Sequence, residues 1–189
     1  METMRRILVG ISGASGAPIA IRLLQRLKEM SDVETHLVMT RGAKLTIEQE
    51  TEVTVDQVKK LADVVYENEE IGSRPASGSF SIDAMIIVPC SMKTVAGIAG
   101  GYSDNLLLRA ADVVIKEARP LFLVVRVSPI GPIHLRNLQE LSMMGVQIVP
   151  PMISYYQKYQ TIEEWTDNFV ERLLGKLGMQ NHMQTWEGM

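Results

Sequence analysis

The sequence has little cysteine and no long hydrophobic run, and both shortages exclude classes of protein. Cys90 is the single cysteine among 189 residues, so no intramolecular disulfide can form and a cysteine-rich metal site is excluded. No uninterrupted apolar stretch reaches the roughly 18 residues that a membrane-spanning helix needs. The histidines show no spacing typical of metal ligands. These shortages favour a cytoplasmic enzyme or binding protein.

Positive charge is not in excess either. The chain has 19 Lys and Arg residues against 22 Asp and Glu, and its formal net charge is -3, so no general attraction to nucleic acid is expected. Its 46% hydrophobic and 22% charged residues are typical of a globular protein. The length suits one domain with its own core, so we expect a single domain over residues 1–189, with a polar tail over residues 178–189.

Short apolar runs alternate with helical patterns along the chain, which predicts βαβ units and a three-layer α/β domain with a mostly parallel sheet. Strands are expected at residues 7–9, 34–39, 64–66, 84–88, 121–127 and 146–149. Helices are expected at residues 18–30, 41–50, 55–62, 91–98, 104–118, 133–144 and 162–177, with Asp104 as a cap. In such a sheet, ligands bind beyond the carboxyl ends of the strands, so we expect the loops that follow the strands to form the ligand site.

The loop after the first strand is Gly10–Ala17, and it is rich in small residues. Small residues let a ligand approach the backbone, and the following helix offers free N–H groups to an anion. Ser12 and Ser15 add hydroxyl donors. The glycine spacing is not the dinucleotide G-x-G-x-x-G, and the lysine of a P-loop is missing. The loop predicts a phosphate-bearing ligand, with a tight turn that binds nothing as the alternative.

Two later loops also follow strands. Thr40 and Arg41 place a hydroxyl and a cation where NAD enzymes often carry an acidic residue, which disfavours NAD. Residues 89–94 open a helix after the most apolar strand and offer a second anion-binding terminus. Cys90 lies in this segment, and we interpret it as a small buried apolar residue because no base is placed beside it.

Several cations follow in the second half of the chain. Arg109 and Lys116 are seven residues apart and so share one helix face, as either ligand contacts or solvated charges. Arg126 interrupts the apolar run 121–127, where an arginine is costly unless it pairs with an anion. Glu50 stands in an acidic run that, taken alone, is typical of a solvated surface.

Taken together, these segments resemble the UbiX-type flavin prenyltransferases over nearly the whole chain. The matching pieces are GISGASGA (10–17), ETHLVMTRGA (34–43), Glu50-Thr51, PASGS (75–79), IIVPCSMKT (86–94), AGIAGGYSDNL (96–106), RAADVVIKEARPL (109–121), PIHLRNL (132–138) and Tyr155-Tyr156. The combination of PASGS with PCSMKT and RAADVVIKE is specific to this family.

The resemblance implies a Rossmann- or flavodoxin-like α/β sandwich, assembled as a homododecamer with sites at subunit interfaces. It implies transfer of a dimethylallyl group from dimethylallyl monophosphate to N5 and C6 of reduced FMN, with no metal. The product, prenylated FMN, is the cofactor of UbiD-type decarboxylases, which are therefore the expected recipients.

The resemblance also implies roles for individual residues. The flavin contacts fall on Gly13, Ala14, Ser15, Thr40, Ser91, Met92, Lys93, Thr94 and Arg126. The prenyl-phosphate contacts fall on Tyr156 and Arg172, joined by Arg109 or Lys116 from a neighbouring subunit. The acid–base carboxylate falls on Glu50, so Glu50, Arg109 and Lys116 are the expected catalytic residues.

Two departures from the family pattern qualify this expectation. The family has Glu after the strand arginine, whereas this chain has Val127. The family tyrosine is followed by His and then Pro, whereas Tyr156 is followed by Gln157, Lys158 and Tyr159. Three alternatives therefore stay open: a non-catalytic FMN carrier for a decarboxylase, an FMN-dependent decarboxylase of cysteine-type substrates, and an NAD enzyme. The last two are disfavoured by the missing histidine after the first helix and by the glycine spacing.

Overall fold

The structure is a computed structural model that describes residues 4–182, and its centre is a six-stranded sheet in which every pairing is parallel. The strands are β1 (Arg5–Ile11), β2 (Val33–Met39), β3 (Val64–Glu67), β4 (Ala84–Cys90), β5 (Leu121–Val125) and β6 (Gln147–Ile148). Their order is β3-β2-β1-β4-β5-β6, so the winding reverses between β1 and β4. This is the Rossmann order, and it confirms the predicted α/β sandwich.

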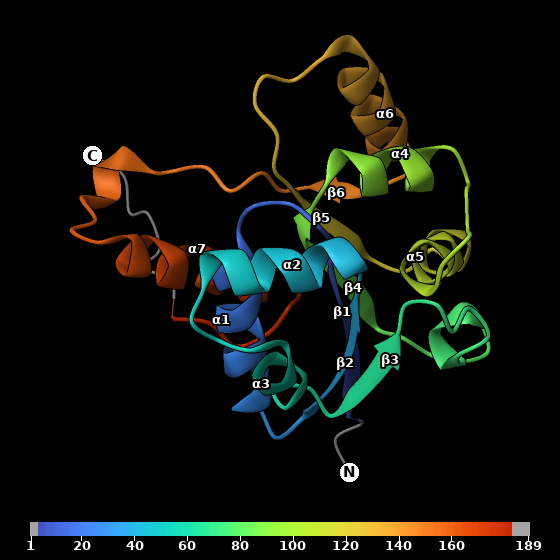
Figure 1. Cartoon of the computed structure of the whole chain (residues 1–189), viewed down its shortest axis with the longest axis horizontal. Coiled ribbons are helices and arrows are strands. Elements are labelled where there is room, and N and C mark those ends of the chain that lie inside the picture. The colour runs from blue at the N-terminus through green and yellow to red at the C-terminus, as the bar shows by residue number, and fades with distance from the viewer. Residues whose placement is uncertain (1–3, 183–189) are drawn as a thin grey trace.

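Helices cover both faces of the sheet (Figure 1). They are α1 (Ala17–Lys28), α2 (Arg41–Glu50), α3 (Val55–Lys59), α4 (Met92–Ala99), α5 (Leu106–Lys116), α6 (Pro132–Met143) and α7 (Ile162–Lys176). Two 3₁₀ turns, η1 (Arg74–Ala76) and η2 (Tyr155–Gln157), lie between them.

The strands feed two separate cores because successive side chains of a strand point to opposite faces. In β1, Ile7, Val9 and Ile11 pack with residues of α1, α2, α3 and α7. Leu8, which lies between them, packs on the other face with residues of α4, α5 and α6. All the residues of β4 and β5 are buried, as expected for strands that are covered on both faces.

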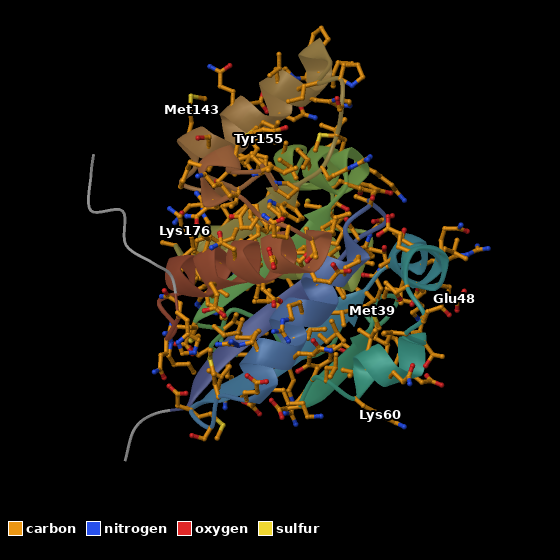
Figure 2. All side chains as sticks on the ribbon, turned by 90° about the vertical axis from the view of Figure 1, so that its left-hand side faces the viewer. Met39, Glu48, Lys60, Met143, Tyr155 and Lys176 are labelled. Carbon is orange, nitrogen blue, oxygen red and sulfur yellow. The ribbon has the colours of Figure 1, made fainter. Side chains whose placement is uncertain are left out.

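The C-terminal helix α7 packs on α1, and Figure 2 shows the two helices side by side. The guanidinium of Arg5 donates hydrogen bonds to the carbonyls of Leu177 and Gly178, both at 2.8 Å. Met179 is buried beside them. The first part of the predicted tail is thus docked on its own chain, whereas residues 183–189 lie outside the described residues.

Several predicted boundaries differ from those of the structure, and three of them concern the second half of the chain. The strand β5 ends at Val125, and Arg126 is exposed, so the expected penalty for burying this arginine does not arise. Helix α5 begins at Leu106, and its cap is Asn105, not Asp104, because the Asn105 side chain accepts the N–H of Leu108. The last strand is shorter than residues 146–149.

Within residues 4–182, no helix is both long and apolar enough to cross a bilayer.

Candidate functional site

A pocket of about 380 Å³ lies at the carboxyl edge of the sheet. Its wall combines the loops that follow four strands with the start of α5. The lining residues are Gly13, Thr40, Arg41, Gly42, Asn68, Glu69, Ser91, Lys93, Thr94, Asn105, Leu107 and Leu108. The structure therefore brings together Gly13, Thr40, Ser91, Lys93 and Thr94, all of which the sequence predicted as flavin contacts.

Two helices begin at this pocket with unpaired amides. Thr40 caps α2, and its hydroxyl accepts the N–H of Ala43 at 3.1 Å. Ser91 caps α4 in the same way and accepts the N–H of Thr94 at 3.4 Å. In the part of the chain that the structure describes, the amides of Gly42 and Lys93 have no acceptor. Two positive helix ends with free donors, together with Lys93 itself, make this pocket suited to an anionic group.

The backbone amides at the amino end of α1 are not free, although the sequence of the loop predicted that they would be. The carboxylate of Glu50, the last residue of α2, accepts the N–H groups of Gly16 and Ala17, both at 2.9 Å. Since these amides are already paired, the loop Gly10–Ala17 does not offer them to a phosphate. The loop taken alone suggested a phosphate at this helix, whereas the family resemblance assigns the phosphate charge largely to Thr40, the Ser91–Thr94 turn and the arginines, and the open ends of α2 and α4 suit that assignment.

Glu50 is half-buried, and its electrostatic surroundings hold it in the ionised form. Burial raises the pKa of Glu50, but the hydrogen bonds from Ser15, Gly16 and Ala17 and the positive charge of Arg126 outweigh burial. The net effect is a pKa below the ordinary value of 4.5. Glu50 is thus a carboxylate at neutral pH, and this contact also places Ser15 and Arg126 around one acidic group.

Ser12 does not serve a ligand as the sequence suggested. Its side chain is buried, its hydroxyl donates to the carbonyl of Pro89 at 3.0 Å, and it accepts the N–H of Ser91 at 2.8 Å. Both hydrogen bonds join the end of β1 to the end of β4. Ser12 therefore joins β1 and β4, the two strands between which the winding of the sheet reverses. Ser15 is the hydroxyl of this loop that forms a hydrogen bond with the Glu50 carboxylate.

Glycine is required where the first loop passes the start of α2. A Cβ atom built on Gly13 would lie 3.0 Å from the Cα of Gly42 and 3.1 Å from its carbonyl carbon. Such contacts are tighter than a Cβ atom usually makes, so a side chain here would push the two backbones apart, and the two glycines let them meet at the pocket wall. Ala14 and Met92, also predicted as flavin contacts, are half-buried beside this wall, at the loop and at the first turn of α4.

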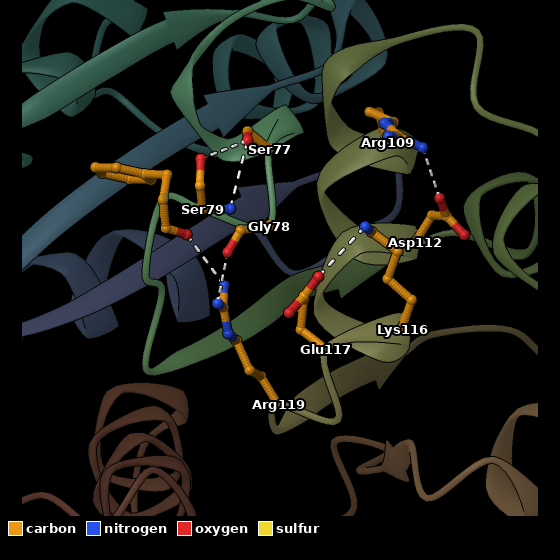
Figure 3. A network of polar contacts seen from close by, with 9 residues as sticks. Ser77, Gly78, Ser79, Arg109, Asp112, Lys116, Glu117 and Arg119 are labelled. Atoms are coloured by element: carbon orange, nitrogen blue, oxygen red, sulfur yellow. Dashed lines mark hydrogen bonds and ion pairs between the residues drawn. The ribbon is translucent and has the colours of Figure 1, made fainter.

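The predicted catalytic cations lie on α5, away from the pocket lining. Figure 3 shows Arg109 paired with Asp112 at 2.9 Å and Lys116 paired with Glu117 at 3.3 Å. These pairs are partly exposed, so they hold the two cations only weakly.

The PASGS loop lies beside α5, and the side chain of Arg119 binds backbone carbonyls in and next to this loop. Arg119 donates to the carbonyls of Gly78 at 2.8 Å and Phe80 at 3.0 Å (Figure 3). A Cβ on Gly78 would overlap the carboxylate of Glu117. The family motif is therefore packed against the end of α5 that carries Lys116.

The predicted prenyl-phosphate residues lie elsewhere. Tyr156 is exposed in η2, and Arg172 is exposed on α7, where it donates to the Ser154 hydroxyl at 3.4 Å. Figure 1 places α5 on the right and η2 and α7 on the left of the molecule. One chain therefore does not bring Arg109 and Lys116 to Tyr156 and Arg172, as expected if the two sets meet between subunits.

Cys90 has the buried position that the sequence predicted. Its side chain is inaccessible, and burial raises the pKa of the thiol far above its ordinary value. A buried neutral thiol is a poor nucleophile, so covalent catalysis through Cys90 is disfavoured.

The sequence reasoning missed several pocket residues, among them Asn68 and Asn105. Asn68 follows β3 directly, and the rule that ligands bind after parallel strands pointed to this position. Asn105 was missed because the neighbouring Asp104 is an equally good helix cap on sequence grounds and was chosen in its place. Arg41 was recognised only as a feature that disfavours NAD, yet it lines the pocket.

Comparisons with known proteins identify the family. Residues 1–174 match the family model described as "Flavoprotein". A probable UbiX-like flavin prenyltransferase of Streptomyces sp. (strain D7) is 49% identical over 185 residues, covering 97% of this chain and 92% of the relative. The chain belongs to the UbiX-like flavin prenyltransferases.

Two solved structures are similar over almost the whole chain. A dodecameric FMN-dependent UbiX-like decarboxylase from Escherichia coli O157:H7 is 47% identical with a TM-score of 0.94, covering 97% of this chain and 100% of the other. AnUbiX (PadA1), in complex with FMN and dimethylallyl pyrophosphate, is 42% identical with a TM-score of 0.92, covering 97% and 99%. Among residues 4–182 there is no group of acidic, histidine and cysteine side chains that could hold a metal ion.

Proposed function

We propose that this chain transfers a dimethylallyl group from dimethylallyl monophosphate to N5 and C6 of reduced FMN, with the flavin bound in the pocket at the carboxyl edge of the sheet. The observations that carry the proposal are the pair of open helix ends at one pocket and an ionised carboxylate, Glu50, which is not part of the pocket lining but binds the same loop that supplies Gly13 to it. A phosphate-bearing flavin needs the first feature, and an alkylation that releases a proton needs the second. The identities of 49% and 42% to UbiX-like proteins support the same reaction.

Different residues of the pocket would bind the phosphate and the ring system of the flavin. The amides of Gly42 and Lys93, the hydroxyls of Thr40 and Thr94 and the Lys93 ammonium would hold the flavin phosphate. The close approach of Gly13 to Gly42 leaves the backbone free of side chains where a ring system would pass. These donors fit a monophosphate, and their place at the switch point is where flavin and nucleotide ligands bind in this topology.

We assign the chemical steps to three sets of residues: Glu50, Arg126, and the cations of a neighbouring chain. The carbon–oxygen bond of the prenyl phosphate breaks and a bond from carbon to N5 forms, while the N5 proton leaves with the departing phosphate. Closure then joins the double bond of the prenyl group to C6: one prenyl carbon takes up a proton while C6 releases one, so this second step is neutral in protons overall. The Glu50 carboxylate accepts the C6 proton, because its pKa below 4.5 keeps it ionised and ready as a base. Arg109, Lys116, Tyr156 and Arg172 would bind the departing phosphate, each hydrogen bond to the ion being worth about 1.5–3 kcal/mol.

The oligomer is part of the proposal. The similar Escherichia coli structure is dodecameric, and this chain separates the two sets of phosphate-binding residues. We propose a homododecamer in which α5 of one chain completes the site of the next. Exposed apolar side chains such as Ile133, Met143 and Met152 supply surface for these contacts.

The product would be delivered to a UbiD-type decarboxylase. A cytoplasmic location belongs to the same proposal, because reduced flavin is maintained in a reducing compartment. We assign the flavin site to one domain that spans residues 1–189.

The experiment is a mass measurement. Protein, reduced FMN and either dimethylallyl monophosphate or dimethylallyl pyrophosphate are incubated without oxygen, and the flavin is examined for one added C5 unit. We expect the adduct with the monophosphate. FMN that stays bound without gaining mass would contradict the enzyme and favour the carrier.

A decarboxylase is the second candidate, because the Escherichia coli structure is described in that way. It would release CO₂ from an aromatic or cysteine-type acid in the presence of FMN alone, and the same incubation with such acids tests for it. The prenyltransferase is favoured because Glu50 is ionised and can accept a proton, whereas the thiol of Cys90, the single cysteine, is buried and neutral.

A further inference from the structure

Asn68 is a polar side chain of the pocket that none of the preceding assignments uses. It follows β3, it is only 7% exposed, and it lines the pocket. The side chain as a whole is buried, but its Nδ2 is not among the buried side-chain atoms that lack a partner in the described residues, so this atom is accessible at the pocket.

The amide oxygen of Asn68 is already engaged. Its Oδ1 accepts the N–H of Leu107 at 3.1 Å, and its backbone carbonyl accepts the N–H of Leu106 at 2.8 Å. Asn68 thus closes the amino end of α5 from outside the helix. Because a backbone N–H can only donate, the oxygen must face Leu107, and the orientation of the amide group is fixed.

The amide nitrogen is therefore the atom left for the pocket. No acceptor for Asn68 Nδ2 occurs among residues 4–182. The nearby Asn105 is different, since its Nδ2 donates to the Asp104 carboxylate at 2.8 Å. Asn68 Nδ2 is thus a fixed, unpaired donor that lines a pocket rich in other donors.

We infer that Asn68 is a positioning residue that donates a hydrogen bond from Nδ2 to a phosphate oxygen of the bound flavin. The inference rests on the proposed function for the identity of the ligand, but it adds a specific contact. The free amides of α2 and α4 and the cations Arg41 and Lys93 select an anion for the same pocket. The one carboxylate in the lining, Glu69, does not provide a partner for the Asn68 amide.

The same side chain joins the ligand to α5. Because Oδ1 holds Leu107 while Nδ2 holds the phosphate, flavin binding fixes the start of the helix that carries Arg109 and Lys116. These cations are the ones that we propose for a neighbouring site, so Asn68 connects the flavin of one site with the phosphate-binding residues of another.

The test uses Asn68→Asp in the full-length protein. This change keeps the oxygen that accepts from Leu107 and replaces the donor by a negative oxygen. A negative charge at a helix amino end is favourable, so we expect the variant to fold with an unchanged thermal midpoint. Its affinity for FMN should fall by about ten- to a hundredfold, the loss expected for a hydrogen bond to a charged group. Its affinity for riboflavin, which lacks the phosphate, should change by less than about threefold.

Asn105→Asp is the matched control. It places the same charge at the same helix end and in the same pocket, but its amide nitrogen is already paired with Asp104. We expect it to weaken FMN binding less than Asn68→Asp does. A second variant, Asn68→Ala, should lose both stability and FMN affinity, because it removes both hydrogen-bonding atoms.

Equal losses for FMN and riboflavin, or no loss of either in Asn68→Asp, would overturn the inference. Binding is measured without prenyl donor, so this outcome is independent of turnover. Wild-type protein that binds FMN but forms no C5 adduct would contradict the proposed function and leave the Asn68 contact standing.

Discussion

The carboxylate of Glu50 accepts the backbone N–H of Gly16 at 2.9 Å and thereby closes the amino end of α1. This contact joins the last residue of α2 to the loop that follows β1. An acidic side chain at this place stabilises the helix and is itself held in the ionised form. The proposed base is consequently fixed by the same hydrogen bonds that lower its pKa.

Replacing Glu50 by Gln should separate binding from turnover. The amide oxygen of Gln still accepts one N–H, so FMN affinity should change little. Turnover should fall by about a hundredfold or more, because a neutral amide cannot take the proton. Titration with FMN and the rate of adduct formation measure the two effects, and unimpaired turnover would remove Glu50 from the mechanism.

The same variant should change the acid sensitivity of the fold. Because the folded state lowers the pKa of Glu50 below 4.5, the carboxylate stabilises the protein above that pH and loses this effect as pH falls through the lowered value. The difference in thermal midpoint between wild type and Glu50→Gln should therefore be largest near neutral pH and shrink in acid. A constant difference across this range would contradict the assignment.

The contact between Glu50 and Gly16 also marks the limit of what the sequence predicted. The alternation of strands and helices placed the pocket loops correctly, because ligand sites follow from parallel topology. The two residues are 34 positions apart, and no local pattern indicates that an acidic residue at the end of α2 will occupy the start of α1. The glycine-rich loop taken alone therefore predicted an open anion site at α1, where the fold supplies its own anion, and only the family resemblance assigned the phosphate to Thr40, the Ser91–Thr94 turn and the arginines.

Arg126 and Asn68 illustrate two further limits. The apolar Val127 extended the predicted strand past its true end at Val125, and Arg126 was consequently expected inside the sheet. Asn68 stands in a polar stretch that is typical of a solvated loop, and its burial follows only from the packing of α5. In both cases the deciding contact is made with an element that is distant in sequence.

Gly13→Ala should disturb the pocket without adding charge. The new Cβ would lie 3.0 Å from the Cα of Gly42, so the backbone has to shift. We expect a loss of about 1–3 kcal/mol in the free energy of unfolding, together with weaker FMN binding. Gly72→Ala is the control, since a Cβ at Gly72 meets nothing within 4 Å, and this variant should leave both measurements unchanged.

Mixed oligomers should reveal whether two chains share one site. Arg109→Ala and Tyr156→Phe should each lose most activity, because each removes one contact to the departing phosphate. Dissociating both variants and reassembling them in equal amounts should restore activity in about a quarter of the sites, where both contributing chains are intact at the relevant position.

The control for this mixture is each variant reassembled alone, which should stay inactive. A mixture that also stays inactive, although its size by ultracentrifugation matches the wild type, would show that the residues act within one chain.

Val127 is the position where this chain departs most clearly from the family pattern. It follows Arg126, whose amide donates to the carbonyl of Cys90 at 3.2 Å and whose charge acts on Glu50. A carboxyl group at position 127 would lie beside these groups and could pass a proton to the departing phosphate. We therefore expect Val127→Glu to raise the rate of adduct formation by about tenfold or more, with FMN affinity unchanged. Val127→Gln has the same length without the acid and should not raise the rate. Equal rates for Val127→Glu and the wild type would mean that the reaction does not need an acid at this position, and that the phosphate-binding cations suffice.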